Sequence, residues 1–373
     1  MTPRERLLRT LRRERVDRVP ISTYELVGWN PDHFENRAPS YRRLMDRIRA
    51  DTDCLYMWGW NAWADSELWD TRRETRPDGA SVTHARLHTP LGDLTRASVE
   101  RPDVHTVWTT EHLLKGPRDV DAFLRVLPDL YRIDESRVPA AVAQYAEALE
   151  RLGDRGILMN DGSDPSACVP DLFEFGLFTT MCYEHRDKIV ELIDAFTGPV
   201  LERLRLDAEL GFGPMIRLCG PEYYTPPYLP PPFFEEMVLP SLAAATRVFS
   251  DAGIFVRAHC HGRIREALPH IVAAGAHGLD PIEPPPDGDI TLREVKERYG
   301  ERLVLFGNTE LKMLEHGAPE QIREAVREQM NAAKAGGGYV IMPTAAPINE
   351  PLSPRTERNY FAWIDAALEF GAY

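Results

Sequence analysis

The sequence predicts a (β/α)8 barrel of the TIM type, and three observations lead to this prediction. The chain has 373 residues, of which 43% are hydrophobic, and this is enough to bury a large core. From about residue 137 onward, short apolar stretches alternate with amphipathic stretches, a pattern typical of parallel strands covered by helices. No linker rich in Gly or Ser interrupts the alternation, which favours one barrel domain over residues 1–373.

Residues 1–135 are expected to form the N-terminal helices, the first strands and an extra β-hairpin. Residues 2–13 predict a helix that Thr2 caps and Pro3 begins. Residues 17–22 lead into a first strand, and residues 53–63 (DCLYMWGWNAW) predict another strand with its loop. Residues 81–98 alternate around a Thr-Pro-Leu-Gly turn, so we expect a hairpin there, outside the barrel.

Residues 136–373 are expected to hold the regular strand–helix repeats. The predicted strands are 156–159, 215–218, 254–258, 278–282, 303–306 and 339–342. The predicted helices are 138–151, 171–181, 186–210, 233–250, 263–274, 291–299, 318–335 and 354–370. An open doubly wound sheet is the alternative, but it would normally carry a glycine-rich phosphate turn between a strand and a helix. Residues 336–338 (GGG) precede a strand and not a helix, so we expect these glycines to end the preceding helix and not to bind phosphate.

Composition excludes several classes of partner. The formal net charge of −14 argues against nonspecific nucleic-acid binding and against anionic membrane surfaces. No apolar run is long enough to span a membrane, and the charged N-terminus is not a signal peptide. The five cysteines are widely spaced and form no CxxC pair, so we expect a cytoplasmic protein without a disulfide framework. A homodimer is compatible with the sequence.

Polar side chains follow most of the predicted strands. In a barrel, catalytic groups lie at the carboxyl ends of the strands. Candidates at these ends are Asp161, Asp164, Glu222, Asp280, Glu283, Asn308, Glu310 and Thr344. We expect Glu222 and Asp161 to handle protons and Asn308 to contact substrate.

The most specific signal is His259-Cys260-His261 at the end of a predicted strand. Because side chains alternate along a strand, both imidazoles are expected on one side and Cys260 on the other. Two imidazoles on one face suit Zn²⁺ or another divalent ion, with Glu283 as a third ligand and Glu222 as a fourth ligand or a supporting partner. Cys260 either packs in the core or, if the strand bends, reaches the metal. The alternative is two unrelated histidines, one of them paired with a carboxylate.

Aromatic residues near these ends have two interpretations. Tyr223 and Tyr224 lie beside a proline-rich stretch, where they either pack as a rigid loop or form the wall of a ligand pocket. Trp60, with Trp58 and Trp63, either belongs to the core or covers an apolar substrate.

Four stretches carry a resemblance to a known superfamily: TPRERLLRTLRRERVDRVP, AHCHGRIREALPHIVAAGAHGLDPIEPP, RYGERLVLFGNTEL and GGGYVIMPTAAP. Over nearly its whole length the chain resembles the uroporphyrinogen decarboxylase-like superfamily, and within it the corrinoid-dependent methyltransferase branch. True uroporphyrinogen decarboxylases have an arginine-rich loop after the first strand, whereas residues 23–29 here (TYELVGW) contain no arginine. We therefore expect no decarboxylation of uroporphyrinogen.

The methyltransferase branch holds zinc with a His-x-Cys-Gly motif and a late cysteine. His259 and Gly262 match that motif, but His261 replaces its cysteine, and Ala345 stands near the late cysteine position. Glu283 or Glu222 would have to complete the zinc site.

The resemblance implies a metal-dependent methyltransferase or demethylase that moves a methyl group between a small molecule and a separate corrinoid protein. The corrinoid would come with that partner, because the chain has no Asp-x-His-x-x-Gly stretch. A metal-dependent decarboxylase or lyase acting on another small acid is one alternative. A non-catalytic ligand-binding barrel is the other.

Overall fold

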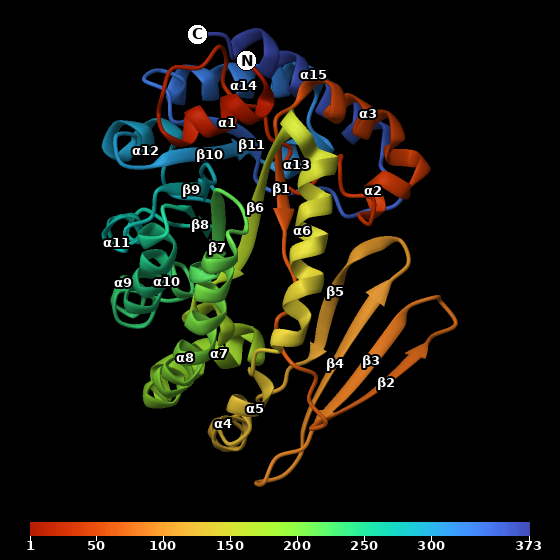
Figure 1. The fold of residues 1–373 in the computed structure, drawn as a ribbon, viewed down its shortest axis with the longest axis vertical. Helices are drawn as coiled ribbons and strands as arrows, with labels where there is room; N and C mark the ends of the chain where they lie inside the picture. Colours follow the sequence, from red (N-terminus) through yellow and green to blue (C-terminus); the bar gives the residue numbers. More distant parts are fainter.

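The computed structural model describes residues 1–373 and is built around a curled, seven-stranded parallel sheet with the strand order β1-β6-β7-β8-β9-β10-β11 (Figure 1). Each strand pairs in parallel with the next one in this order. The strands are β1 (Cys54–Trp58), β6 (Gly156–Ser163), β7 (Met215–Cys219), β8 (Phe255–Cys260), β9 (Gly278–Pro281), β10 (Val304–Thr309) and β11 (Tyr339–Pro343).

The side-chain alternation of the strands creates two apolar layers. Ile157, Met159 and Met215 belong to a compact cluster with Val304 and Val340 that joins five of the strands to Leu7 of the first helix. The intervening residues, such as Ile216 and Leu218 of β7, belong to the large cluster between the sheet and the helices. The short apolar strands of the sequence are therefore buried on both faces, as parallel strands usually are.

The eighth strand position of a closed barrel is occupied only by a short extended segment, residues 19–22. Ile21 forms an isolated parallel bridge with Ile341 of β11. On the other side, the N–H of Asp53, just before β1, donates to the carbonyl of Ile21 at 2.7 Å between N and O. The prediction of a full (β/α)8 barrel is thus confirmed for seven strands only. Pro20 explains part of the difference, because it has no N–H for a strand ladder.

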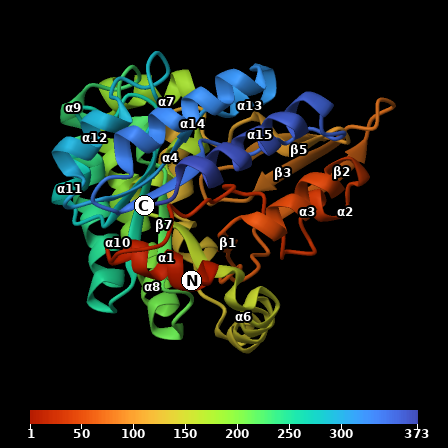
Figure 2. The same ribbon diagram turned by 90° about the horizontal axis from the view of Figure 1, so that it is seen from above.

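Helices cover the outer side of the sheet (Figures 1 and 2). The main helices are α1 (Pro3–Leu11), α3 (Arg42–Asp51), α6 (Val138–Leu152), α7 (Phe175–Glu184), α8 (Arg186–Leu210), α10 (Leu239–Asp251), α12 (Leu292–Tyr299), α14 (Pro319–Ala333) and α15 (Pro354–Phe370). The shorter ones are α2 (Phe34–Arg37), α4 (Pro117–Leu124), α5 (Leu127–Leu130), α9 (Pro231–Phe233), α11 (Leu268–Ala273) and α13 (Leu311–His316). The predicted helix at 263–274 begins later, at Leu268. None of the helices is long and apolar enough to cross a bilayer.

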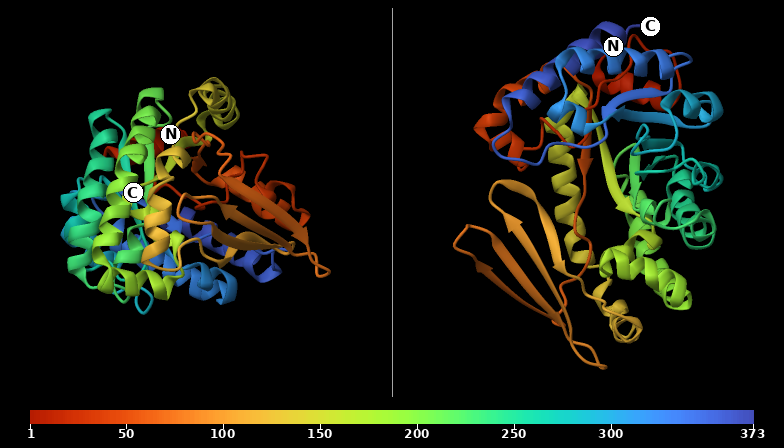
Figure 3. Two further views of the ribbon diagram at one scale, coloured as in Figure 1. Left: turned by 90° about the horizontal axis from the view of Figure 1, so that it is seen from below. Right: turned by 180° about the vertical axis from the view of Figure 1, so that it is seen from behind.

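A second, antiparallel sheet stands beside the barrel (Figures 1 and 3). Its strands β2 (Trp69–Thr75), β3 (Ser81–Leu87), β4 (Leu94–Arg101) and β5 (Val104–Glu111) pair in sequence order. The predicted hairpin is confirmed as β3 and β4. Strands β2 and β5 were not predicted, because most of their side chains are exposed and give no apolar alternation. The start of β5 is joined to residues 348–350, since the His105 N–H donates to the Ile348 carbonyl at 2.8 Å.

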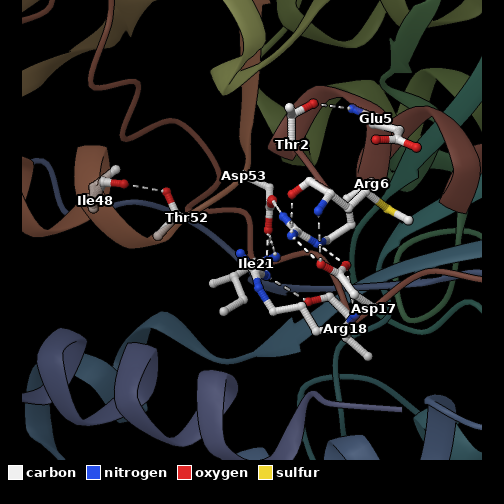
Figure 4. Close-up of polar contacts among 11 residues, drawn as sticks. Thr2, Glu5, Arg6, Asp17, Arg18, Ile21, Ile48, Thr52 and Asp53 are labelled. Carbon is white, nitrogen blue, oxygen red and sulfur yellow. Dashed lines mark hydrogen bonds and ion pairs between the residues drawn. The ribbon is translucent and has the colours of Figure 1, made fainter.

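A network of buried ion pairs lies at the amino end of β1 (Figure 4). Asp53, which has no exposed surface, accepts hydrogen bonds from Arg6, from Arg18 at 2.7 Å and from the Ile21 N–H at 2.8 Å. Arg6 also forms a two-pronged pair with Asp17, at 2.7 and 2.9 Å. This network ties α1 and the segment 19–22 to the first strand of the sheet.

Candidate functional site

A layer of charged side chains lies at the carboxyl ends of β6 to β9. The strand register pairs Arg217 with Arg257, and Cys219 with His259. His259 is in turn paired with Asp280 on β9. Because residues two apart share a face of the sheet, Arg217, Arg257 and His259 follow the interior residues Met215 and Phe255. The polar layer therefore follows the apolar interior layer in the direction of the carboxyl ends of the strands.

His259 is buried and held by Asp280. The His259 Nδ1 lies 2.7 Å from one oxygen of Asp280, and Arg257 Nε lies 2.6 Å from the other. Burial acts to raise the pKa of Asp280, but the charges of Arg257 and His259 outweigh it and hold that pKa well below its usual range. Asp280 is thus a fixed negative charge that accepts from Nδ1, and only Nε2 of His259 is left without a hydrogen bond.

His261 has an equivalent partner in Glu283. Its Nδ1 lies 2.9 Å from Glu283 Oε1, while the Gly262 N–H donates to Glu283 Oε2 at 2.6 Å. Burial acts to lower the pKa of His261, but the hydrogen bond and charge of Glu283 outweigh it and raise the pKa above its usual value. Gly262 has φ +79°, a left-handed conformation that favours glycine and turns its N–H toward the carboxylate. The two rings lie edge to face, with centroids 4.6 Å apart.

A second group surrounds Arg217. Its Nε donates to Asp161 Oδ1 at 2.7 Å, and its Nη1 donates to the Tyr24 hydroxyl at 3.0 Å. The Tyr24 ring also lies 6.2 Å from the His259 ring between centroids. Tyr24 has φ +57°, which is strained for a residue with a side chain. Tyr24 therefore joins the Arg217–Asp161 pair to His259.

The donor atoms fit a divalent ion in part. In both histidines a carboxylate holds Nδ1, which is how proteins orient imidazoles whose Nε2 binds a metal. Glu222 adds a carboxylate oxygen, Oε2, that is buried and has no hydrogen-bond partner. No group of three or more His, Cys, Asp and Glu side chains is placed to hold a metal together. The Nε2 atoms of His259 and His261 are therefore available as two metal ligands. A third ligand, such as Glu222, would have to move to complete the site.

Several predicted site residues lie elsewhere. Cys260 is 1% exposed and belongs to the core between the sheet and the helices, and burial raises its pKa well above the usual value. Tyr224 is fully buried and donates to the Ser166 carbonyl at 2.9 Å. Trp60 donates its indole N–H to Asp207 of α8 at 2.9 Å, and the Arg203 guanidinium lies over its ring. Asn308 is buried and donates to the Ile282 carbonyl at 2.8 Å. These four side chains pack or support loops in the structure.

Two cavities open at this end of the sheet. The first, which we call the His261 cavity, has a volume of about 930 Å³ and is lined by His261, Glu283, Glu222, Tyr223 and residues 170–171 and 173–175, among others. The second, the Glu35 cavity, has a volume of about 580 Å³ and is lined by Asp161, Arg217, Glu35 and His105, among others. Strand β5 borders both, through Thr109 and His105. The predicted residues Glu222, Tyr223, His261 and Glu283 thus share one cavity, and Asp161 lines the other.

Four residues near the site were not predicted from the sequence: Tyr24, Arg217, Arg257 and Glu35. A signal was present for the two arginines, because each interrupts an otherwise apolar strand (MIRLC and FVRAH). A charged residue in a buried parallel strand needs a partner at the strand end, and the strand-end aspartates supply it. No comparable signal marks Tyr24 or Glu35, which come from segments without regular periodicity.

Residues 172–349 match the family model for Uroporphyrinogen decarboxylase (URO-D). The resemblance to the uroporphyrinogen decarboxylase-like superfamily is confirmed for this part of the chain. Among solved structures, the chain is similar to a methyltransferase from Methanosarcina mazei, with 19% sequence identity, coverage of 99% of both chains and a TM-score of 0.64. At this identity the similarity establishes the fold alone, over 99% of the chain. No curated protein matches the sequence.

Two other solved structures superpose too loosely to support an inference. D-psicose 3-epimerase from Clostridium cellulolyticum H10 is 12% identical over 63% of this chain and 86% of its own, with a TM-score of 0.37. A putative fructose-1,6-biphosphate aldolase from Coccidioides immitis is 13% identical over 63% of this chain and 76% of its own, with a TM-score of 0.30.

Proposed function

We propose that the protein is a metal-dependent methyltransferase or demethylase that moves a methyl group between a small molecule and the cobalt of a separate corrinoid protein. The observation that carries this proposal is the pair of histidines at the strand ends, each with Nδ1 held by a carboxylate and Nε2 free. The whole-chain similarity in fold to a methyltransferase supports the same reaction class.

His259 and His261 would hold the metal, which we propose to be zinc, and Glu222 would be the third protein ligand. Bound zinc would supply a Lewis acid for a substrate oxygen or sulfur, where it would lower the pKa of a thiol or polarise a methoxy group. Asp280 and Glu283 orient the two imidazoles and make them more basic. The single net positive charge left by two neutral imidazoles and one carboxylate suits an electron-rich substrate atom.

The chain's own residues have separate tasks in this proposal. Asp161, held in place by Arg217, handles protons at the edge of the Glu35 cavity, and Glu222 does so when it is not bound to metal. Tyr24 closes the space between the Arg217 pair and His259. Tyr223 forms part of the wall of the His261 cavity, from which a corrinoid could approach.

Uroporphyrinogen is a poor substrate for this site. Two arginines do lie inside the sheet, but Asp161 neutralises Arg217 and Asp280 neutralises Arg257. A substrate with eight carboxylates would therefore find both arginines of the polar layer already paired, and the cavities are lined by further acids. We expect no coproporphyrinogen in an anaerobic assay, and its formation at enzyme-like turnover would contradict the proposal.

The proposal is tested in two stages. Metal analysis of the purified protein should find about one equivalent of zinc, lost in His261→Ala but retained in His316→Ala, an exposed histidine far from the site in the sequence. Free cob(I)alamin should then be methylated by candidate methyl donors, followed by its absorbance, only with the metal-loaded protein. Full metal content in His261→Ala would refute the site. Turnover of a small carboxylic acid with release of CO2 would favour the lyase alternative.

A further inference from the structure

The Glu35 cavity contains a buried carboxylate that has no partner. Glu35 is 5% exposed, and its Oε2 makes no hydrogen bond. The nearest cationic candidate is Nδ1 of His33, at 3.9 Å, which is too far for a hydrogen bond. A buried carboxylate without a partner is costly, so this position requires either a proton or a bound cation.

The charges around Glu35 leave no free cation for it within the chain. Four carboxylates line the cavity, those of Glu25, Asp32, Glu35 and Asp161, against the guanidinium groups of Arg37 and Arg217. Arg217 is committed to Asp161 and Tyr24, and Arg37 donates to the backbone carbonyl of Asp32 at 2.8 Å. With neutral histidines, four negative and two positive charges leave the lining at −2.

The walls of the cavity are held in place. The His105 ring stacks on Phe34 with centroids 3.5 Å apart, and its Nε2 lies 2.8 Å from Glu350. Strand β5 and residues 348–350 are thereby fixed over α2, which carries Glu35. Trp58 adds an aromatic surface to the same lining. A ligand would enter a site whose shape is already formed, which limits the entropy cost of binding.

We propose that the Glu35 cavity binds a protonated methylamine, with the ammonium N–H donating to the unpartnered oxygen of Glu35. The unpartnered oxygen needs a hydrogen-bond donor, and the negative lining favours a positive charge. Both conditions together select a protonated amine over a quaternary ammonium ion, which has no N–H, and over a neutral alcohol. Burial raises the pKa of Glu35 to about 7, in keeping with a carboxylate that has no cation beside it in the chain.

This inference rests on the proposed function and names its methyl donor. The carbon–nitrogen bond would break with its electron pair going to nitrogen, so that the protonated amine leaves as a neutral amine without another proton. The new carbon–cobalt bond would use the electron pair of cobalt(I) in the partner, which becomes cobalt(III). Glu35 would keep the amine protonated until the bond breaks. Asp161 lines this cavity, and Tyr24 lies between the Arg217–Asp161 pair and the His259 ring.

Calorimetric titration tests the inference without metal or corrinoid. At about pH 8, where Glu35 is ionised, dimethylammonium chloride should bind the wild-type protein. Tetramethylammonium chloride should bind at least about tenfold more weakly, and methanol should not bind measurably. The comparison of the three probes on the wild-type protein does not depend on any variant folding correctly.

Variants then locate the site. Glu35→Gln, which keeps the shape, should weaken dimethylammonium binding by about tenfold or more, whereas Asp46→Asn, an exposed carboxylate outside the cavity lining, should change it less than about twofold. Equal binding of all three probes, no binding of dimethylammonium, or unchanged binding in Glu35→Gln would each overturn the inference. Dimethylammonium binding without any methylation of cob(I)alamin would instead refute the proposed reaction.

Discussion

Two buried polar networks lie at opposite ends of the parallel sheet, and they use their charges differently. At the amino end, both oxygens of Asp53 are bound, to Arg6, Arg18 and the Ile21 N–H (Figure 4). At the carboxyl end, each of the two histidines has one nitrogen bound and one free, and Glu222 has a buried oxygen without a partner. A network with every group satisfied stabilises a fold, whereas one with aimed but unsatisfied groups is suited to binding.

The largest expected effect is on stability at the amino end. Asp53→Asn removes the buried counter-charge of Arg18 and one of the two counter-charges of Arg6, so it should lower the free energy of unfolding by about 3–5 kcal/mol. Urea denaturation followed by circular dichroism measures this. Asp51→Asn is the matched control, because Asp51 pairs with Arg47 at a partly exposed site and should cost less than about 1 kcal/mol. If both substitutions cost the same, the Asp53 network does not carry the stability assigned to it.

The second expected effect is a pH dependence that originates at the carboxyl end. Burial raises the pKa of Glu35 to about 7 in the folded protein, whereas an unfolded glutamate has a pKa of about 4.3. Between these values the folded state holds a proton that the unfolded state has released. The stability contributed by Glu35 is therefore full below about pH 4.3 and falls as pH rises toward 7, by up to about 4 kcal/mol.

Glu35→Gln should remove this fall. Denaturation curves at several pH values between about 4.5 and 7.5 should show a smaller decline for the variant than for the wild-type protein. An identical pH dependence in the two proteins would mean that Glu35 is not the unsatisfied group described here. The charged groups nearest to Glu35 are Glu25 and His105, with His33 on the same segment, and all three are unchanged in the comparison.

The third effect concerns metal affinity. Glu283→Gln keeps the shape of the side chain but removes the charge that holds His261, so zinc affinity should fall by roughly tenfold or more. Cys260→Ala should leave affinity unchanged, because the Cys260 thiol packs in the core away from the two imidazoles. Competition with a chromophoric chelator measures both. The reverse outcome would mean that Cys260 supplies a thiolate ligand.

The sequence allowed much of the parallel sheet to be predicted, because its strands are apolar and regularly spaced. All six strands expected after residue 136 are present, and helix α15 has the predicted bounds of 354 and 370. Three features could not be predicted in this way. The segment at 17–22 forms a bridge and not a strand, because its pairing depends on neighbours distant in sequence. Strands β2 and β5 are mostly exposed, and Tyr24 and Glu35 reach the site only through tertiary packing.

The candidate site shows the same division. The alternation of strand side chains correctly placed His259 and His261 together and Cys260 in the other layer. It did not separate Tyr223, which lines a cavity, from Tyr224, which is buried. The two residues are adjacent in a short 3-10 helix (Pro221–Tyr224), where no strand or α-helix period assigns a direction. The direction of the Trp60 side chain could not be predicted either, because Trp60 lies in the loop after β1.

The smallest expected effect is again on stability at the amino end of the sheet. It tests whether the exposure of an ion pair, and not only its charge, determines how much the pair stabilises the protein. The hydrogen bond from Arg6 is the main cause that lowers the pKa of Asp17 below its usual value. Because the folded pKa is depressed, the stability contributed by Asp17 is present above about pH 4 and is lost as pH falls further. Its side chain is 45% exposed, so water and salt screen the pair, and Asp17→Asn should cost less than about 1 kcal/mol at neutral pH. Acid denaturation should also be slightly less steep in this variant than in the wild-type protein.

Asp17 and Asp53 bind the same arginine, so the two substitutions can be compared directly. If Asp17→Asn lowered the free energy of unfolding as much as Asp53→Asn, the number of ion pairs, and not their burial, would determine the stability of this end of the sheet.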